Sequence, residues 1–275
     1  MLKKLFIILL LAVISLSIYT VFVNLSSNWQ YNQDMKALEN NYALSENVSI
    51  ADINSSRIPS PLANYLRFSQ ASRSKLPVYV KLNYSGRYRA DSYSEFKTFR
   101  AKSFYSVKNG HYVSEWFVDN NRIIFEKIKE KLTDRDSIYD RNLLGIRNIE
   151  GSSNQNTALY LNSRIMMDAA YFPYYYLSSN CSDWTYLGPR RVRITANTEA
   201  GPLNFDMNFN DNNSLSSISS ESFTFLGDTV RFTASYDNYV TRNNFRIPNS
   251  IRVVCERNFS EFVLYEASLD NINYR

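Results

Sequence analysis

The chain has 275 residues, enough for one large domain beside an N-terminal anchor, and its 7 glycines and 7 prolines exclude a collagen-like or proline-rich linker protein. The net charge is +5, part of which belongs to Lys3 and Lys4 of a targeting segment, so the body has a mixed, solvated surface that does not indicate nucleic-acid binding. The 21 tyrosines and 17 phenylalanines are typical of β-strands and of aromatic-lined cavities.

The N-terminus has the pattern of a membrane anchor. Lys3 and Lys4 precede Leu5–Val23, a run without charge that would extend about 28 Å as a helix, close to the ~30 Å of a bilayer core. A cleaved signal peptide has a shorter apolar run and small residues before the cut, and neither is present here. We therefore favour an uncleaved signal anchor at residues 1–23, with secretion after cleavage as the alternative. The two lysines predict that the body lies outside the cytoplasm, on the bacterial inner membrane.

A stalk and one domain are expected to follow the anchor. Residues 24–56 are polar and weakly periodic, with a short helix predicted at Gln33–Tyr42. Residues 57–275 form the expected single domain, which opens with a short helix because Ser60 can cap it and Pro61 suits its first position.

From Pro77 onward, apolar residues alternate with a period of two, which predicts antiparallel strands joined by Asn-, Asp- and Gly-containing turns. The stretch Thr133–Gly151 is mixed, and its apolar residues Ile138, Leu143, Leu144 and Ile146 are expected to lie under the sheet. The expected strands are Val78–Ala90, Glu95–Val107, Tyr112–Val118, Arg122–Ile128, Arg190–Thr198, Leu203–Asn210, Ser214–Phe225, Thr229–Val240, Phe245–Arg257 and Glu261–Tyr274.

One helix stands between the two sets of strands. Asn156 or Thr157 can cap it, apolar residues occupy nearly every side of it, and Pro173 ends it. A helix that is apolar all round is buried. The sequence therefore predicts a mainly β (α+β) fold, in which a large curved antiparallel sheet or half-barrel surrounds a central buried helix, beside the N-terminal transmembrane helix.

The helix and its aromatic exit are the candidate walls of a pocket for an apolar or amphiphilic, lipid-like ligand, with ordinary core packing as the alternative. Asp168 is polar on an apolar helix, and Arg164 one turn earlier predicts an ion pair within the helix. The candidate lining residues are Leu159, Met166, Asp168, Ala170, Tyr171, Phe172, Tyr175 and Trp184.

Few residues offer chemistry. A single histidine, His111, excludes a two-histidine zinc site, and its place beside a hairpin turn predicts an ordinary surface residue. We find no nucleotide-binding, nucleophile-elbow or C-x-x-C motif, and we expect no metal, cofactor or catalytic residue. Cys181 and Cys255 either form a disulfide or are two separate buried thiols. Asp168 and Asp183 are candidates for a carboxylate pair of the kind that glycosidases use.

Several landmarks resemble a bacterial family of unknown function. Ile58–Leu62, followed by Tyr65-Leu66, resembles its Leu-Pro-x-Pro-Val-x-x-Tyr-Leu signature, and Ala169–Pro173 is similar to the Glu-Ala-x-Trp-Phe-Pro end of its helix. Gly86-Arg87-Tyr88, Tyr236–Tyr239 and Arg246-Ile247-Pro248 are similar to its strand motifs, although Tyr171 replaces its usual tryptophan and Asp168 its glutamate. The resemblance implies a membrane segment and a curved sheet wrapped on helices, as in periplasmic lipoprotein carriers. It implies no reaction.

Three functions remain open from the sequence. The first is an envelope protein that binds an amphiphile between sheet and helix, and the second is a structural or interaction protein with a filled core. The third is a hydrolase that uses carboxylates such as Asp168 and Asp183. The state of the space between the central helix and the strands, empty or filled, is the observation that distinguishes them.

Overall fold

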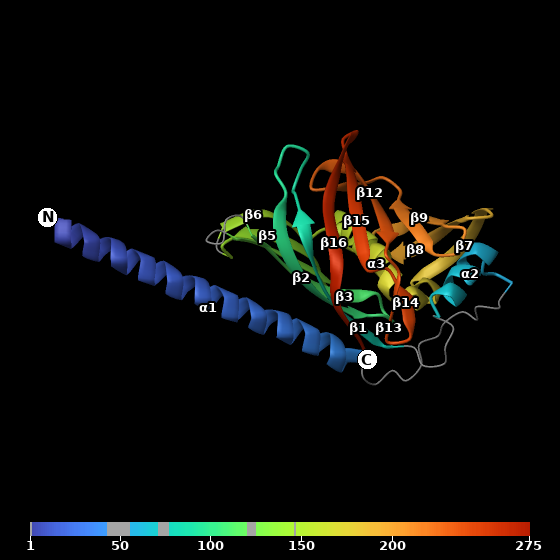
Figure 1. Cartoon of the computed structure of the whole chain (residues 1–275), viewed down its shortest axis with the longest axis horizontal. Helices are drawn as coiled ribbons and strands as arrows, with labels where there is room; N and C mark the ends of the chain where they lie inside the picture. Colours follow the sequence, from blue (N-terminus) through green and yellow to red (C-terminus); the bar gives the residue numbers. More distant parts are fainter. Residues whose placement is uncertain (1, 43–55, 71–76, 120–124, 146) are drawn as a thin grey trace.

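The computed structural model describes residues 2–42, 56–70, 77–119, 125–145 and 147–275 (Figure 1). A 14-stranded antiparallel sheet dominates these residues, in the order β6-β5-β4-β3-β2-β1-β16-β15-β12-β10-β9-β8-β7, with β11 paired to β12. In chain order the strands are β1 Tyr79–Tyr88, β2 Lys97–Ser106, β3 His111–Asp119, β4 Phe125–Leu132, β5 Ser137–Leu143, β6 Arg147–Ser152, β7 Cys181–Gly188, β8 Arg191–Thr198, β9 Gly201–Phe209, β10 Leu215–Ser220, β11 Phe223–Phe225, β12 Asp228–Asp237, β13 Val240–Arg242, β14 Phe245–Ile247, β15 Ser250–Arg257 and β16 Ser260–Tyr274.

The sheet curves into a half-barrel around helix α3, Gln155–Asp168, as predicted (Figure 1). The helix begins at a capping box in which Asn154 accepts from the backbone of Thr157 and Thr157 accepts from the backbone of Asn154. The cap therefore lies two residues before Asn156, the first of the two expected positions. Two short 3₁₀ helices follow, η1 Ala169–Tyr171 and η2 Pro173–Leu177, and both are wholly buried.

The N-terminal helix α1 spans Leu2–Tyr42 without a break, so the helix expected at Gln33–Tyr42 is the end of a longer one. By length and composition α1 can cross a membrane, and none of its most apolar window is buried within the protein. Its second half packs on the outer face of the sheet, where Tyr31 and Leu38 meet Phe104 and Val113. The expected stalk is thus a docked helix as far as Tyr42, and residues 43–55 lie outside the described residues.

The strand predictions are confirmed where one face of a strand is buried and the other is solvated, as in β8 and β9. Strands β5, β6 and β7 were not predicted, because β6 has no buried position, β5 has only Tyr139 and, among its described side chains, β7 has only Cys181. Their side chains therefore show no alternation. Ile138 and Leu143, expected under the sheet, are partly buried within β5, and Ile146 lies outside the described residues. The expected strand Arg122–Ile128 begins outside the described residues, since β4 starts at Phe125 after the gap at 120–124.

One end of the half-barrel is plugged. Helix α2, Ser60–Phe68, buries Leu62, Tyr65 and Leu66 there, and Pro61 stands in its first turn as expected. The Tyr65 ring lies 5.6 Å from Phe209 and 6.4 Å from Tyr176 of η2. Phe245 of the β13–β14 hairpin packs on Tyr174 and Tyr274 beside them. This end is therefore closed by aromatic side chains. We name the opposite end, where β1 and β15 finish, the open end, because a pocket lined by Tyr88, Ala90 and Arg257 lies there (Figure 1).

Candidate functional site

A small pocket lies at the open end of the half-barrel, and we name it the mouth pocket. Its cavity volume is about 30 Å³, room for one or two water molecules, whereas pockets for small organic ligands have about 300–1,000 Å³. In this conformation the space between helix and sheet is therefore filled. The lining residues are Tyr88, Ala90, Trp116, Ile128, Glu130, Tyr139, Glu150, Tyr160, Arg164, Phe225, Phe232, Cys255, Arg257, Leu264 and Tyr265.

Arg164 of α3 forms the floor of the mouth pocket and is 1% exposed. It donates from Nη2 to Tyr84 Oη at 3.1 Å and from Nη1 to the hydroxyl of Tyr265. Its guanidinium carbon lies 5.0 Å from the ring centre of Trp116, within reach of a cation–π attraction. Its Nε makes no hydrogen bond to the described residues. One buried donor at the floor is therefore left without an acceptor.

Two carboxyl groups lie beside Arg164. Asp168 Oδ2 lies 3.4 Å from Nη2, which confirms the predicted pair within the helix, and Glu130 Oε2 of β4 lies 3.8 Å from Nε. Tyrosine hydroxyls donate to both acids: Tyr105 to Asp168 at 2.5 Å and Tyr160 to Glu130 at 2.7 Å. Burial raises the pKa of Glu130 and of Asp168, although the Arg164 charge opposes the rise. The three groups form a buried ionic cluster in which Arg164 Nε alone lacks a hydrogen bond to the described residues.

The walls of the mouth pocket are aromatic and interlocked. Trp116 stacks on Phe99 with the ring centres 4.7 Å apart and meets the edge of Tyr265 at 5.3 Å. On the other side, Phe225 of β11 stacks on Tyr160 at 4.1 Å. Stacked and edge-to-face pairs stabilise such walls beyond their buried area by about 0.5–1.5 kcal/mol each. Among the described strands β11 pairs with β12 alone, so this second wall is the more easily displaced.

The rim of the pocket carries Cys255 and Arg257 of β15. Arg257 Nε lies 3.8 Å from Asp228 Oδ2. Burial raises the pKa of the Cys255 thiol to about 11, so this thiol is protonated and unreactive at neutral pH. Cys181 is the other buried thiol, near Met166 and Tyr175, and both cysteines are free. The structure thus holds two separate thiols in place of the possible Cys181–Cys255 disulfide.

None of the residues predicted to line a pocket lines the mouth pocket. Leu159 is partly buried on α3, and Trp184 of β7 donates to the Tyr176 carbonyl from a partly buried position. The other six fill the core between helix and sheet and are fully buried: Met166, Asp168, Ala170, Tyr171, Phe172 and Tyr175. The lining comes instead from the preceding turn of α3 and from β4, through Tyr160, Arg164 and Glu130.

The candidate catalytic groups do not converge. Asp168 is buried, whereas Asp183 is exposed on the edge strand β7, so they share no cavity. His111 is 6% exposed, not at the surface as predicted, and its Nε2 lies 3.0 Å from Asp134 Oδ1. Within the described part of the chain, no group of three histidine, cysteine or acidic side chains could hold a metal ion.

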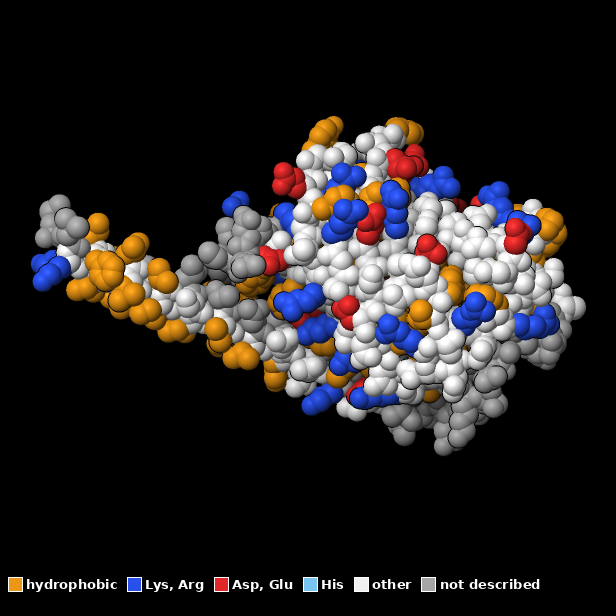
Figure 2. Space-filling view, in the orientation of Figure 1, with side chains coloured by type: hydrophobic (Ala, Val, Ile, Leu, Met, Phe, Trp, Pro, Cys, Tyr) orange, Lys and Arg blue, Asp and Glu red, His pale blue; other side chains and the backbone are white. Residues whose placement is uncertain are grey.

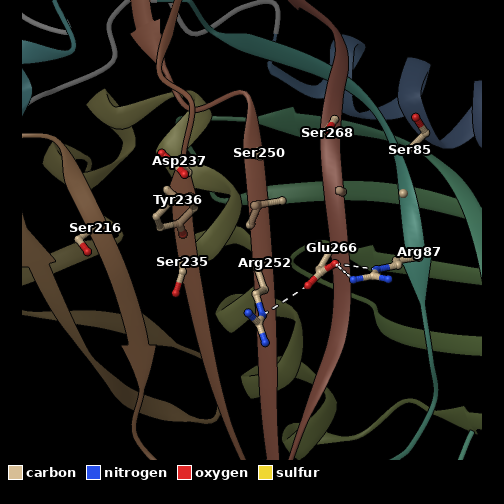
Figure 3. Close-up of a pocket in the computed structure, with 13 residues that line it drawn as sticks. Ser85, Arg87, Ser216, Ser235, Tyr236, Asp237, Ser250, Arg252, Glu266 and Ser268 are labelled. Carbon is tan, nitrogen blue, oxygen red and sulfur yellow. Dashed lines mark hydrogen bonds and ion pairs between the residues drawn. The ribbon is translucent and has the colours of Figure 1, made fainter. Parts of the chain in front are cut away.

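A second hollow of about 680 Å³ lies open on the outer face of the sheet (Figure 3). Serines occupy much of it because Ser85, Ser268 and Ser250 are neighbours in register across β1, β16 and β15. Arg87 and Arg252 both point to Glu266 along one side, with the Arg87 contact at 2.6 Å. Small side chains account for this hollow, and its polar groups pair with one another.

The chain belongs to DUF6544, a family of unknown function, whose family model matches residues 48–267. This confirms the expected membership of such a family. No curated protein matches the sequence. Among solved structures, the chain is similar to a LolA superfamily protein from Nitrosomonas europaea, with 11% identity and a TM-score of 0.42 over 77% of this chain and 92% of that one. It is also similar to a DUF1329 family protein from Desulfovibrio piger, with 11% identity and a TM-score of 0.40 over 80% and 94%. At these identities and TM-scores, the similarity concerns only the course of the backbone.

Proposed function

We propose that this member of the DUF6544 family is a membrane-anchored bacterial envelope protein that binds an amphiphile at the mouth pocket. The charge-free run of α1, unburied by the domain, supports anchoring in the inner membrane. Lys3 and Lys4 ahead of that run support a domain in the periplasm or outside the cell. Secretion after cleavage would keep the pocket and remove the anchor.

The composition of the mouth pocket carries the proposal. Its walls are aromatic and aliphatic, and its floor presents the unfilled Nε donor of the fully buried Arg164. A site with mainly apolar walls and a few polar groups is typical of small-molecule binding sites. The charged lining residues Glu130, Glu150, Arg164 and Arg257 carry equal numbers of opposite charges. The preferred ligand therefore has an uncharged polar end that accepts a hydrogen bond, and an apolar chain.

Binding requires the mouth pocket to widen, because about 30 Å³ cannot hold a chain. The three-residue strand β11 provides the movable wall, since it pairs with β12 through only Phe223, Thr224 and Phe225. Moving Phe225 off Tyr160 opens the space between α3 and β12. The ligand chain would then replace the Phe225 ring against Tyr160 and Phe232.

Quenching of tryptophan fluorescence tests the proposal. The chain has 3 tryptophans, of which only Trp116 lines the mouth pocket. The full chain with Trp29→Phe and Trp184→Phe, in nanodiscs, would be titrated with a brominated monoacylglycerol. We expect saturable quenching of Trp116, because bromine quenches only on contact. Retained helix and strand signals in circular dichroism show that the variant is folded.

Two controls make the result specific. The variant with Trp29→Phe and Trp116→Phe keeps Trp184 on β7, away from the mouth, and should not be quenched saturably. Ala90→Phe narrows the mouth and should abolish the quenching of Trp116, whereas Thr185→Phe, on the exposed side of β7, should leave it unchanged. Absence of quenching at Trp116, or equal quenching at Trp184, overturns the proposal.

A second function, an envelope structural or interaction protein with a filled core, is favoured by one observation. Among the described residues, the six deeply buried ones named above pack the space between α3 and the sheet, and the mouth pocket beside them has only about 30 Å³. If this function is correct, Trp116 stays unquenched at every concentration of the brominated probe, and Ala90→Phe changes nothing but stability.

A further inference from the structure

Two aromatic side chains at the open end are almost fully solvent-exposed. Tyr93, in the loop between β1 and β2, is 97% exposed, and Phe259, in the turn between β15 and β16, is 96% exposed. No other large hydrophobic side chain outside α1 exceeds 54% among the described residues. Hydrophobic side chains are visible at the upper edge of the molecule, above the charged side chains of the same hairpins (Figure 2). We name this feature the aromatic rim.

The backbone at Phe259 is strained. Arg257 pairs with Ser260, so Asn258 and Phe259 form a two-residue turn, and both have positive φ, at +48° and +68°. This is the type I′ pattern, in which glycine is favoured at the second position because a Cβ is strained there. The turn therefore holds a strained phenylalanine that packs on nothing. A residue that departs from the glycine preference of its turn, and makes no packing contact to offset the strain, indicates a role outside folding.

The two tips belong to one surface. Strands β1 and β16 are antiparallel neighbours with Tyr88 opposite Tyr265, so the loop after β1 and the turn before β16 leave the sheet at the same end (Figure 1). Arg89 joins the two hairpins, because its guanidinium lies over the ring of Phe96 at 4.9 Å and over that of Phe262 at 5.6 Å. The tips are held side by side at the entrance of the mouth pocket, whose lining includes Ala90 and Arg257.

The anchor leaves almost no spacer between membrane and sheet. Val23, the last residue of the apolar run Leu5–Val23, lies so close to the β5–β6 turn that a Cβ on Gly145 would collide with it. Four residues later, Ser27 donates to Glu115 of β3. A bilayer that holds Leu5–Val23 therefore lies directly against one side of the domain. The strand register continues from Leu143 through Glu126, Val118 and Phe99 to Gly86, so the β5–β6 turn lies at the same end of the sheet as the aromatic rim. The surface that covers the aromatic rim is on this account the same bilayer.

The two hairpin tips that carry the aromatic rim have balanced charges, which bears on whether they attract anionic lipid. Residues 87–97 carry Arg87, Arg89 and Lys97 against Asp91 and Glu95, and residues 256–261 carry Arg257 against Glu256 and Glu261. The total is four positive and four negative charges, so the rim has no net attraction for anionic lipid. Tyrosine and phenylalanine suit the bilayer interface, where an apolar ring enters the chains near the headgroups.

We propose that the aromatic rim dips into the interface of the bilayer that holds α1, through Tyr93 and Phe259, so that the mouth pocket opens toward lipid. Contact is driven by burial of the two rings and not by charge. The inference rests on the anchoring part of the proposed function and is independent of the pocket. It makes the bilayer the source from which an amphiphile enters the mouth.

Position-specific quenching in nanodiscs tests the inference on the full chain. In a Trp29→Phe background, tryptophan is placed at one tip by Phe259→Trp or by Tyr93→Trp. A matched control, Tyr186→Trp, places it at the half-exposed Tyr186 on the far edge strand β7. Each variant is compared with the background in phosphatidylcholine discs with and without bromine on the acyl chains. We expect several-fold stronger quenching at both tips than at position 186, unchanged by high salt.

The outcomes separate this inference from the proposed function. Retention of the full chain in the discs after alkaline washing tests the anchor by itself. If the chain is retained and positions 93 and 259 are quenched no more than position 186, the aromatic rim does not contact the bilayer and the inference is wrong. Quenching that disappears in high salt would contradict the ring-burial mechanism. The Trp116 experiment with the monoacylglycerol is unaffected by either result.

Discussion

Replacement of Arg164 by methionine is the most informative perturbation of the ionic cluster. Methionine keeps much of the side-chain volume but removes the charge, which leaves Glu130 and Asp168 buried at 1% and 2% exposure without a cation. Breaking a buried pair by removal of one partner costs about 3–5 kcal/mol. The variant also loses the hydrogen bonds to Tyr84 and Tyr265. We therefore expect a loss of at least 3 kcal/mol in the free energy of unfolding.

The loss should depend on pH in a defined direction. Burial already raises the pKa of Glu130 above 4.5 and that of Asp168 above 3.8, and removal of Arg164 removes the charge that opposes this rise. A carboxyl whose pKa is higher in the folded state stabilises fully below its unfolded pKa, and this stability is lost as pH rises through the folded pKa. The destabilisation by Arg164→Met should therefore be larger at pH 8 than at pH 5.

Urea unfolding of the full chain in detergent micelles, followed by circular dichroism, measures both effects. The matched control is the triple variant Arg164→Met, Glu130→Gln, Asp168→Asn, which removes all three charges while keeping side-chain shape. It should be more stable than the single variant at pH 8 and nearly independent of pH between 5 and 8. A single variant that loses less than about 1 kcal/mol, or a triple variant no better than the single one, would refute the assignment of a buried ionic cluster stabilised by Arg164.

Three further substitutions follow from the contacts. Phe259→Gly should raise the free energy of unfolding by about 1 kcal/mol in urea titration, because it relieves positive φ at an exposed turn. Glu115→Gln should loosen α1 from the sheet, which would be detected as faster hydrogen exchange in α1. Burial raises the pKa of Glu115, but hydrogen bonds from Lys102 and Lys127 outweigh it and lower the pKa overall. The docking of α1 in the wild type should therefore weaken as pH falls through that lowered pKa. Gly86→Ala should cost about 1–3 kcal/mol in urea unfolding, because its Cβ would collide with the backbone carbonyl oxygen of Glu266.

Strands could be predicted from the sequence wherever one face of the strand is buried and the other is solvated. In β8 and β9 the buried and exposed positions alternate, and the sequence shows the same alternation. The central helix was predictable because nearly all its faces are buried. Strand β6 was not, since all its side chains are exposed or partly exposed, and a strand without a buried face has no period to detect.

The mouth pocket was less predictable because it depends on which end of the half-barrel is plugged. Nothing in the helix sequence distinguishes the turn with Tyr160 and Arg164, which faces the open end, from the turn with Met166 and Tyr171, which is covered. One signal was present: in Phe125–Leu132, Glu130 has the same parity as Ile128 and Leu132 and so must face the interior. An inward acid requires a buried cation, and Arg164 is the candidate on the helix.

The position of the ionic cluster explains why the open end can remain adaptable. A buried charge cannot move far from its partners without a large desolvation penalty, so Arg164, Glu130 and Asp168 hold α3 rigidly against β4. The walls above the cluster are held by ring contacts, of which the Phe225–Tyr160 stack contributes about 0.5–1.5 kcal/mol beyond burial. Displacing the Phe225 wall of the mouth pocket therefore costs several-fold less free energy than separating the ionic cluster at its floor. Under the proposed anchoring, a protein that opens at β11 and keeps its floor would exchange a ligand with the bilayer without unfolding.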